Sequence, residues 1–375
     1  MNSQFKAIAI LVGTTIGAGI FGVPYVISKI GFLPGLFYIL ILGGLILILN
    51  LVYSEIVLRT PGDHQFSGYA QIYLGKKTKS LQILSMLSFF ISMYGAFLAY
   101  LVGISEFCNL LFGGGNSILW GIVFFIFAAI VIHLGLKAIS YFGLIFVSFL
   151  LCLFVLFFIL GAGKIEIANL NTFYPAFLLL PYGVILFALS GNSVIPEMEE
   201  VLRQDPQKMK KAVIIGSLIP VFVYILFAFL IVGICGKFTS EDAMSGLLIF
   251  LPTWISKLGA CIGIFTMASS FLTITYILKE AWFRDLKQSL SMSFSLACLP
   301  GLLLFLAGAR SFIGILDFSG AVSGGLSGIL ILIMWKKAKE SGKRTPAFNI
   351  EIPRFLVILL YIVLILGTMS PFFVF

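Results

Sequence analysis

Residues 13–24 read GTTIGAGIFGVP, and they lie inside an apolar run that extends from about residue 5 to residue 30. The run is long enough to cross a bilayer as a helix. Its middle, however, holds four glycines, two threonines and a proline, which weaken a helix or remove a backbone donor. A broken helix is tolerated at membrane depth only where protein or a water-filled cavity satisfies the freed backbone groups. This stretch therefore predicts a binding site near the middle of the bilayer.

The composition of the chain is that of an integral membrane protein. Of its 375 residues, 60% are hydrophobic and 10% are charged, with a mean hydropathy of +1.13. We expect one all-α transmembrane domain over residues 1–375, embedded in the lipid bilayer. The N-terminus has no signal-peptide cleavage pattern, so its first apolar run is predicted to be retained. The net charge of +9 comes from short loops between spans, which argues against nucleic acid as a partner.

We expect eleven membrane-spanning segments, at about residues 5–30, 33–58, 81–112, 117–135, 138–162, 174–202, 211–236, 253–283, 289–308, 312–335 and 354–374. Nineteen of the 24 lysines and arginines fall in one alternate set of the loops between these spans. Cytoplasmic loops carry the excess of positive residues. The bias therefore predicts a multi-pass protein of the cell membrane, with the N-terminus in the cytoplasm and the C-terminus outside.

The first and sixth spans share an interruption, and the sixth is expected to be interrupted at residues 190–192 and again by Pro196. Gly19 precedes Pro24 by five positions in the first span, and Gly191 precedes Pro196 by five in the sixth. The spans are five apart, an odd number, so the second unit enters the membrane from the opposite side. This pattern predicts an inverted repeat, a pointer to a transporter site; the alternative is close helix packing through small residues. The predicted parts are repeat one at about 5–162, repeat two at about 174–335, and an added helix at about 354–374.

Three motifs resemble the amino acid–polyamine–organocation transporter superfamily. They are GTTIGAGIFGVP at residues 13–24, YSEIVLRTPG at residues 53–62 and FALSGNSVIPE at residues 187–197. The pattern is most similar to the aromatic amino acid permease and amino acid/auxin permease branch. The resemblance implies the fold of the bacterial leucine transporter, with five plus five inverted helices and discontinuous helices 1 and 6. It also implies a monomer that carries neutral amino acids, aromatic ones among them, by alternating access.

An amino acid substrate needs a partner for its carboxylate and another for its ammonium group. Backbone N–H groups at the start of a half-helix suit the carboxylate, and unpaired carbonyls at the end of a half-helix suit the ammonium. Glycines let the ligand approach the backbone. The family lines its pocket with a residue in the middle of helix 3, which implies a contact from Tyr94. The predicted substrate-binding residues are Thr14, Thr15, Gly17, Ala18, Gly19, Tyr94, Phe187, Ala188, Ser190, Gly191 and Asn192.

A cation site is implied by the same resemblance, because sodium-coupled members hold a cation between helix 1 carbonyls and helix 8 hydroxyls. The matching positions are Gly13, Ile16, Thr266, Ser269 and Ser270. The alternative is that these hydroxyls bond to the preceding helical turn or a neighbouring helix. Some proton-coupled relatives place a lysine in helix 5, but residues 141–160 contain none. Sodium is therefore favoured, protons stay open, and no other cofactor is expected.

Ionisable residues inside a membrane are costly and point to function. We expect Asp317, Glu55 and Glu197 to be candidates for proton coupling or gating. The alternative for Asp317 is an outer carboxylate paired with Arg310. The acidic residues Glu55, Glu197, Glu199 and Glu200 stand near Arg59 and Arg203 in sequence, so they form either the ion pairs of an inner gate or a solvated helix end.

The leading function is thus secondary active transport of a neutral amino acid, driven by a sodium or proton gradient. A membrane receptor that senses an amino acid on the same scaffold is the alternative. A channel needs a continuous polar stripe or a charged ring, and the spans show neither. An enzyme is not expected, because no paired carboxylates, metal cluster or activated nucleophile lies at membrane depth.

Overall fold

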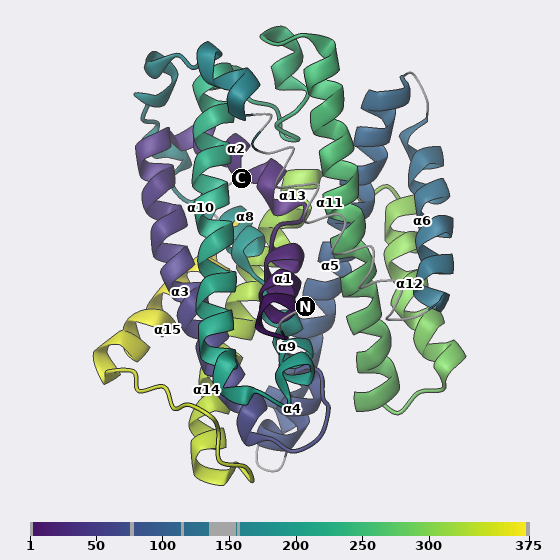
Figure 1. Cartoon of the computed structure of the whole chain (residues 1–375), viewed down its shortest axis with the longest axis vertical. Coiled ribbons are helices and arrows are strands. Elements are labelled where there is room, and N and C mark those ends of the chain that lie inside the picture. The colour runs from purple at the N-terminus through teal and green to yellow at the C-terminus, as the bar shows by residue number, and fades with distance from the viewer. Residues whose placement is uncertain (1–2, 76–78, 114–115, 135–154, 156–157, 373–375) are drawn as a thin grey trace.

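The computed structural model describes residues 3–75, 79–113, 116–134, 155 and 158–372. In these residues the regular structure is helical throughout, without strands. Most helices run roughly along the long axis of the molecule and pack side by side (Figure 1). The all-α class predicted from the composition is confirmed for this part of the chain. Most of the fifth predicted span, at residues 138–162, lies outside the described residues.

Within the described residues, six helical segments are long and apolar enough to cross a membrane. They are built on α3 (Phe32–Arg59), α5 (Lys79–Phe112), α10 (Met209–Cys235), α11 (Thr253–Glu280), α13 (Phe312–Phe318) continued by α14 (Gly325–Ser341), and α15 (Arg354–Thr368). A seventh is the pair α1 (Ser3–Thr15) and α2 (Gly19–Ile30), which are bent by 51° at their break. The shorter helices are α4 (Phe66–Leu74), α6 (Ser117–Leu134) and α12 (Leu290–Leu306). The count of eleven spans stays a prediction.

The sixth predicted span is also broken. Its two halves are α8 (Pro181–Leu189) and α9 (Ile195–Leu202), with a short 3-10 turn at Asn192–Val194 between them. The expected second interruption at Pro196 is wrong, because Pro196 lies in the first turn of α9, where its missing N–H has no intrahelical partner to lose. Likewise, Pro24 lies inside α2 and not at the first break.

The two broken helices lie against each other in opposite directions. The first half of one contacts the second half of the other: α1 contacts α9, and α2 contacts α8. Two glycines permit this approach, because a Cβ at Gly19 would clash with Ala188 and a Cβ at Gly191 would clash with Thr15. This crossing brings both breaks to one place. The inverted repeat and the extent of its two parts stay predictions.

The two predicted sets of loops gather at opposite ends of the bundle. At one end, Ser3 Oγ lies 3.2 Å from Asp205 Oδ2, and the amide of Lys343 donates to Arg59 O at 3.1 Å. At the other end, the amide of Tyr174 donates to Ile30 O at 3.1 Å. Loops of the set predicted to be cytoplasmic therefore share one side where the structure describes them. Which side faces the cytoplasm stays a prediction.

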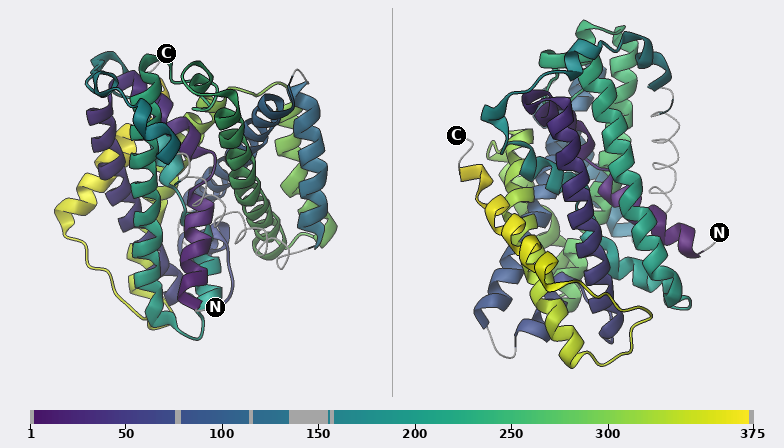
Figure 2. Two further views of the ribbon diagram at one scale, coloured as in Figure 1. Left: turned by 45° about the horizontal axis from the view of Figure 1, so that its top comes forward. Right: turned by 90° about the vertical axis from the view of Figure 1, so that its left-hand side faces the viewer.

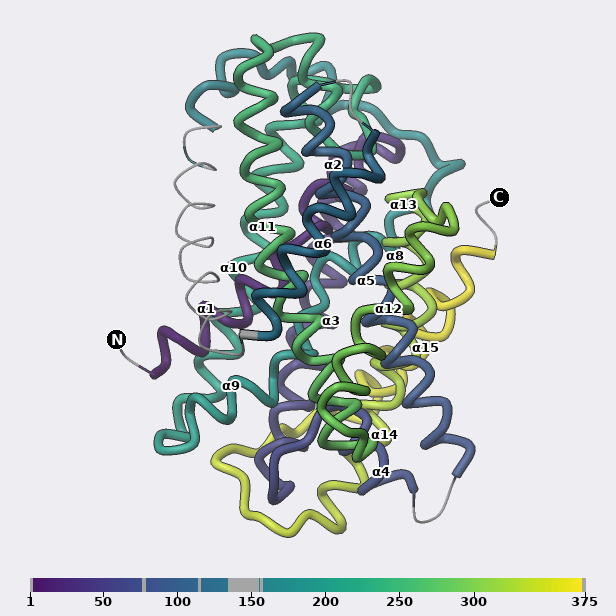
Figure 3. The backbone as a smooth tube through the Cα atoms, turned by 90° about the vertical axis from the view of Figure 1, so that its right-hand side faces the viewer, coloured from purple at the N-terminus to yellow at the C-terminus, as the bar shows by residue number. Residues whose placement is uncertain are grey.

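Three helices cover the outside of the bundle. The helices α6 and α12 pack against α5 (Figure 3), and α15 packs against α14 at the edge of the molecule (Figure 2). Close contact between α15 and α14 depends on Gly325 and Gly328, which face Thr368 and Leu364. Only 28% of the most apolar window of α15 is buried, which suits a helix that presents most of its surface to lipid.

Candidate functional site

The break between α1 and α2 leaves backbone donors at the start of α2. Its N-cap residue, Ala18, provides no side-chain hydrogen bond to the helix. The first N–H groups of a helix have no intrahelical acceptor and carry partial positive charge. Of the three predicted carboxylate ligands, Gly17 already donates its N–H to Thr15 O at 3.0 Å. The amides of Ala18 and Gly19 are thus the two remaining candidates for an anionic group.

The carbonyl ends of both broken helices converge on one tyrosine. The hydroxyl of Tyr224, on α10, lies 2.6 Å from Thr15 O and 2.9 Å from Ala188 O, within donating distance of both. Tyr224 is fully buried. These two carbonyls were expected to face a substrate ammonium unaided, and the structure instead supplies them with a protein donor. Each carbonyl oxygen has a second lone pair for a ligand.

Tyr224 could not be recognised in the sequence. It lies in an apolar run outside the three motifs, and both of its neighbours in the sequence are apolar. Only the packing of α10 against α1, α2 and α8 places its hydroxyl between the two breaks.

The second break uses its polar groups locally. Ser190 donates its hydroxyl to Leu186 O at 2.6 Å, and its amide donates to Phe187 O at 3.1 Å. Gly191 lies directly against Thr15, and Asn192 begins the 3-10 turn that leads into α9. Gly191 and Asn192 thus form the unwound turn that the sequence predicted. The Ser190 hydroxyl is committed to its own helix.

The tyrosine beside the first break is Tyr100, not Tyr94. A Cβ at Gly17 would lie 2.7 Å from Tyr100 Oη and 3.0 Å from Ser270 Oγ. Tyr94 instead donates its hydroxyl to Leu296 O at 2.6 Å and accepts from Trp282 Nε1 at 3.2 Å. The structure therefore does not bring Tyr94 to the breaks. The tyrosine of α5 that reaches the first break is Tyr100, about 1.7 helical turns further along.

Two of the predicted cation ligands, Gly13 and Ser270, meet where α11 crosses α1. The Ser270 hydroxyl lies within donating distance of Gly13 O, at 3.1 Å, and of Thr266 O, at 3.3 Å. Thr266 donates its own hydroxyl to Ile262 O at 2.7 Å. Both hydroxyls thus make the contacts of the alternative, to a neighbouring helix or to the preceding turn, and Ser269 and Ile16 are buried. The carbonyl of Gly13 and the hydroxyl of Ser270 are oxygen ligands of the kind that a hard cation prefers.

Asp317 is a buried carboxylate without a counter-ion among the described residues. Its Oδ1 has no hydrogen-bond partner there and lies against Gly183 of α8, at a place where a Cβ would clash. The predicted pairing with Arg310 is wrong, because that guanidinium lies over the ring of Phe305, 5.7 Å from its centroid. A π-helical turn (Ser319–Gly324) follows directly, a feature that is frequent at functional sites.

Glu55 is a fully paired carboxylate that ties three segments together. It accepts from Arg59 Nε at 2.9 Å, from Trp335 Nε1 of α14 at 2.8 Å and from the amide of Ile350 at 2.9 Å. Its side chain is fully buried. These contacts favour a structural tie over the proton-coupling role that the sequence suggested.

We expect Glu55→Ala to lower the free energy of unfolding by about 3 kcal/mol, because it leaves buried donors and Arg59 without their acceptor. The variant should unfold several degrees below the wild type in a thermal melt of the purified protein in detergent. Glu106→Ala, which removes an exposed carboxylate on α5, is the control. Equal melting temperatures for both variants would contradict the structural role.

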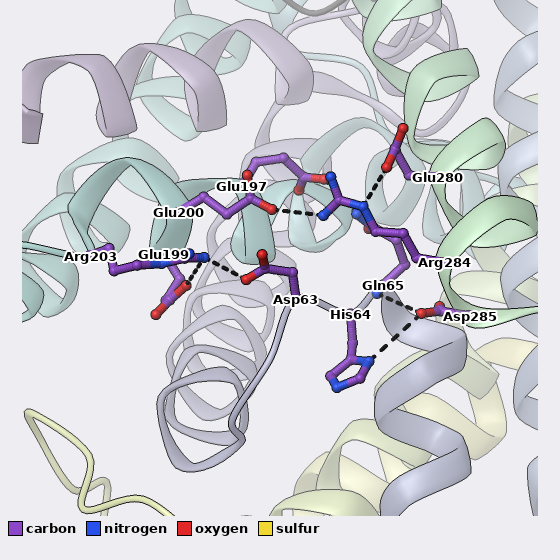
Figure 4. Close-up of polar contacts among 10 residues, drawn as sticks. All are labelled: Asp63, His64, Gln65, Glu197, Glu199, Glu200, Arg203, Glu280, Arg284 and Asp285. Carbon is purple, nitrogen blue, oxygen red and sulfur yellow. Dashed lines mark hydrogen bonds and ion pairs between the residues drawn. The ribbon is translucent and has the colours of Figure 1, made fainter. Parts of the chain in front are cut away.

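A network of ion pairs joins α9, the 63–65 loop and the end of α11 (Figure 4). Arg284 pairs with Glu200 at 3.1 Å and with Glu280 at 2.5 Å. Arg203 pairs with Glu199 at 3.4 Å and with Asp63. Ion pairs predicted from the sequence are thus present: Arg203 pairs with Glu199, and Arg59 pairs with Glu55 inside α3. Their role as an inner gate stays a prediction.

Asp285 fastens the start of α4 to this network. It accepts from the amide of Gly68 at 2.8 Å, from the amide of Gln65 at 3.3 Å and from Ser67 Oγ at 2.5 Å. A carboxylate is favourable at a helix N-terminus. The N-terminal cap of α4 therefore comes from a residue more than 200 positions away, which no local sequence signal announces.

A model of the tryptophan/tyrosine permease family matches residues 1–371. Over 239 residues the chain is 25% identical to glutamine transporter 2 of Aliivibrio fischeri, covering 61% of this chain and 60% of the relative. Over 247 residues it is 26% identical to the low affinity tryptophan permease of Escherichia coli K12, covering 62% and 58%. The matched part thus spans about three fifths of these two relatives.

Two solved structures share the fold. MhsT, in complex with L-phenylalanine, superposes with a TM-score of 0.65 at 14% identity, covering 99% of this chain and 97% of that chain. Mhp1, a nucleobase-cation-symport-1 family transporter, superposes with a TM-score of 0.64 at 14% identity, covering 88% and 77%. Both have the fold of the leucine transporter, which the resemblance in the sequence implied.

Proposed function

Because this chain belongs to the tryptophan/tyrosine permease family, we propose that it is a secondary active transporter of a neutral amino acid. Aromatic amino acids are the first candidates, and a sodium or proton gradient drives the transport. One observation carries the proposal: two broken helices cross so that a free helix N-terminus and two carbonyl ends meet at one buried place. The family and its relatives are transporters and permeases, not enzymes.

The crossing of the breaks matches the two charges of an amino acid without using a charged side chain. The amides of Ala18 and Gly19 suit the substrate carboxylate, as helix N-termini suit anions. The carbonyls of Thr15 and Ala188, each with a second lone pair, suit the ammonium. Tyr100 lies against Gly17 and bounds the place where the carboxylate would lie.

Alternating access requires that one end of the site be closed while the other is open. The ion pairs of Arg203 and Arg284 join α9 to the 63–65 loop and to the end of α11. This state is therefore closed at the end that the loops predict to be cytoplasmic. Release of substrate at that end requires α9 to separate from these partners.

The oxygen ligands at Gly13 and Ser270 are proposed to hold the coupling cation if sodium drives transport. We expect Ser270→Ala to raise the half-saturating sodium concentration about tenfold, because a hydrogen bond or ligand bond lost at a charged group costs roughly 1.5–3 kcal/mol. Sodium titration of uptake into proteoliposomes measures the change. Thr275→Ala, which loses a hydroxyl bonded to its own helix at Phe271 O, is the control. Wild-type uptake that does not change with the sodium concentration would contradict the sodium site.

The experiment that tests the function is uptake into proteoliposomes of a panel of labelled amino acids, including tryptophan, tyrosine, phenylalanine and glutamine. Sodium and proton gradients are imposed separately. Accumulation of at least one amino acid against its gradient is expected, and protein-free liposomes are the control. Saturable binding without uptake under either gradient would contradict transport and favour the sensing receptor.

A further inference from the structure

Three buried polar atoms at the network end of the bundle have no hydrogen-bond partner among the described residues. They are Tyr53 Oη of α3, Gln65 Oε1 of the loop before α4, and Glu197 Oε2 of α9. Tyr53 is 1% exposed and Gln65 is 3% exposed. Gln65 and Glu197 are already in contact, because Gln65 Nε2 donates to Glu197 Oε1 at 2.7 Å (Figure 4).

The contact between Gln65 and Glu197 leaves acceptor oxygens without a donor. The oxygen of a glutamine amide and both oxygens of an ionised glutamate are acceptors only. Neither Gln65 Oε1 nor Glu197 Oε2 has a donor within hydrogen-bond distance among the described residues, and the Tyr53 hydroxyl reaches neither of them. Buried acceptors without a donor are costly, and most of all when they carry charge. A proton on Glu197 removes the negative charge of the carboxylate that lacks a donor at Oε2.

Burial and the charge of Glu200 favour the neutral form of Glu197, and they act against Arg284 and the start of α9, where Glu197 lies in the first turn. Arg284, the cation that acts on it, is committed to Glu200 and Glu280, and Glu200 has the same charge as Glu197 itself. An unpaired carboxylate inside a protein is strongly disfavoured. The titratable groups that act on Glu197 come from each neighbouring element: Tyr53 (α3), Tyr69 (α4), Glu200 (α9), Tyr276 (α11) and Arg284.

We propose that Glu197 binds the coupling proton and links it to the gate between α9 and the 63–65 loop. In the closed state Glu197 carries a proton and accepts from Gln65 Nε2 through Oε1. When α9 separates from the loop, water reaches the carboxyl group, the O–H bond breaks, and the proton leaves to the water on that side. The closed gate therefore holds the proton more tightly than the open gate, as linkage requires.

Gln65 is the positioning residue of this device. Its backbone amide donates to Asp285 Oδ1 at 3.3 Å while its side chain donates to Glu197. The loop is thus held at two points, one on the end of α11 and one on α9. Of the two acceptors, Asp285 and Glu197, only Glu197 lacks an ion pair among the described residues. Protonation of Glu197 therefore acts on its contact with Gln65.

The proposal rests on transport as the function and names the proton as the coupling ion. The test compares the wild type with Glu197→Gln, whose amide is neutral and keeps a donor at the position of Oε2. Tryptophan counterflow, which needs no net proton movement, should stay within about threefold of the wild type. Accumulation driven by a pH gradient, and the matching proton uptake seen by an internal pH dye, should fall at least tenfold. Glu340→Gln, which neutralises an exposed carboxylate of α14 outside the gate, should keep the accumulation ratio.

A readout without transport separates failure of this inference from failure of the function. The infrared carbonyl band of a protonated carboxyl group should be present in the wild type at neutral pH and be lost in Glu197→Gln. A band that persists in Glu197→Gln and disappears in Asp317→Asn would overturn the assignment to Glu197. Unchanged pH-driven accumulation in Glu197→Gln would also overturn it. Wild-type protein that shows the band but exchanges no amino acid would support the proton site and contradict the transport function alone.

Discussion

Gly17→Leu is expected to abolish uptake while the protein still inserts and folds. A Cβ at this position would already lie 2.7 Å from Tyr100 Oη and 2.8 Å from Tyr100 Cε1, and a leucine adds three more carbon atoms. The side chain must fill the space between the first break, Tyr100 and Ser270. A displacement of about 1 Å at a reacting or binding centre costs on the order of 100-fold in rate. Uptake in proteoliposomes should therefore fall to background.

The matched control for this prediction is Gly44→Leu. Gly44 lies in α3, is exposed on the surface of the bundle, and has no atom within 4 Å of the position of a Cβ. This variant carries the same substitution in a membrane helix without touching the breaks. The two variants should elute alike in size-exclusion chromatography. Normal uptake by Gly17→Leu would show that the substrate does not bind at the first break.

Tyr224→Phe is expected to lower uptake about tenfold and to raise the KM for substrate. It removes one oxygen and leaves Thr15 O and Ala188 O, the carbonyl ends of two half-helices, without their shared donor. A buried acceptor left unpaired costs roughly 1–3 kcal/mol, and about 1.4 kcal/mol corresponds to a tenfold change in an equilibrium constant. Because the hydroxyl joins α1 to α8, its loss also loosens the crossing of the two breaks.

Tyr182→Phe provides the control for the loss of a tyrosine hydroxyl. Tyr182 is buried in α8, and its Oη makes no hydrogen bond with the described residues. Removing this hydroxyl should leave uptake within about twofold of the wild type. If both variants transport like the wild type, the Tyr224 hydroxyl does not hold the substrate site.

The broken helices could be predicted because their signals are local. Glycines and prolines within an apolar run oppose a continuous helix wherever they occur, and residues 13–24 and 187–197 contain them at matching places. The apolar composition set the fold class in the same way, because a bilayer accepts only segments whose backbone is paired internally. The exact ends were less accurate: α8 begins at Pro181, after an exposed segment that was included in the sixth span.

The partners of the polar residues could not be predicted, because they depend on contacts between distant parts of the chain. Glu55 accepts from Trp335 and Ile350, which are 280 and 295 positions away in the sequence. The sequence therefore suggested a gate residue, whereas the structure shows a carboxylate that ties distant segments together. Tyr94 and Tyr100 lie on the same helix with similar surroundings in sequence. Only the packing of α11 and α12 against α5 decides their partners: Tyr94 donates to Leu296 O, and Tyr100 lies beside the first break.

Chain composition and local backbone preferences are enough to predict an all-helical membrane protein with two matched helix breaks. The tertiary structure alone decided what the breaks face. It placed Tyr224 between their carbonyl ends, Ser270 against Gly13 O, and Gln65 against Glu197. Hydrogen bonds act only over about 3 Å, so a donor from elsewhere in the chain is assigned to its acceptor only when the helices have packed.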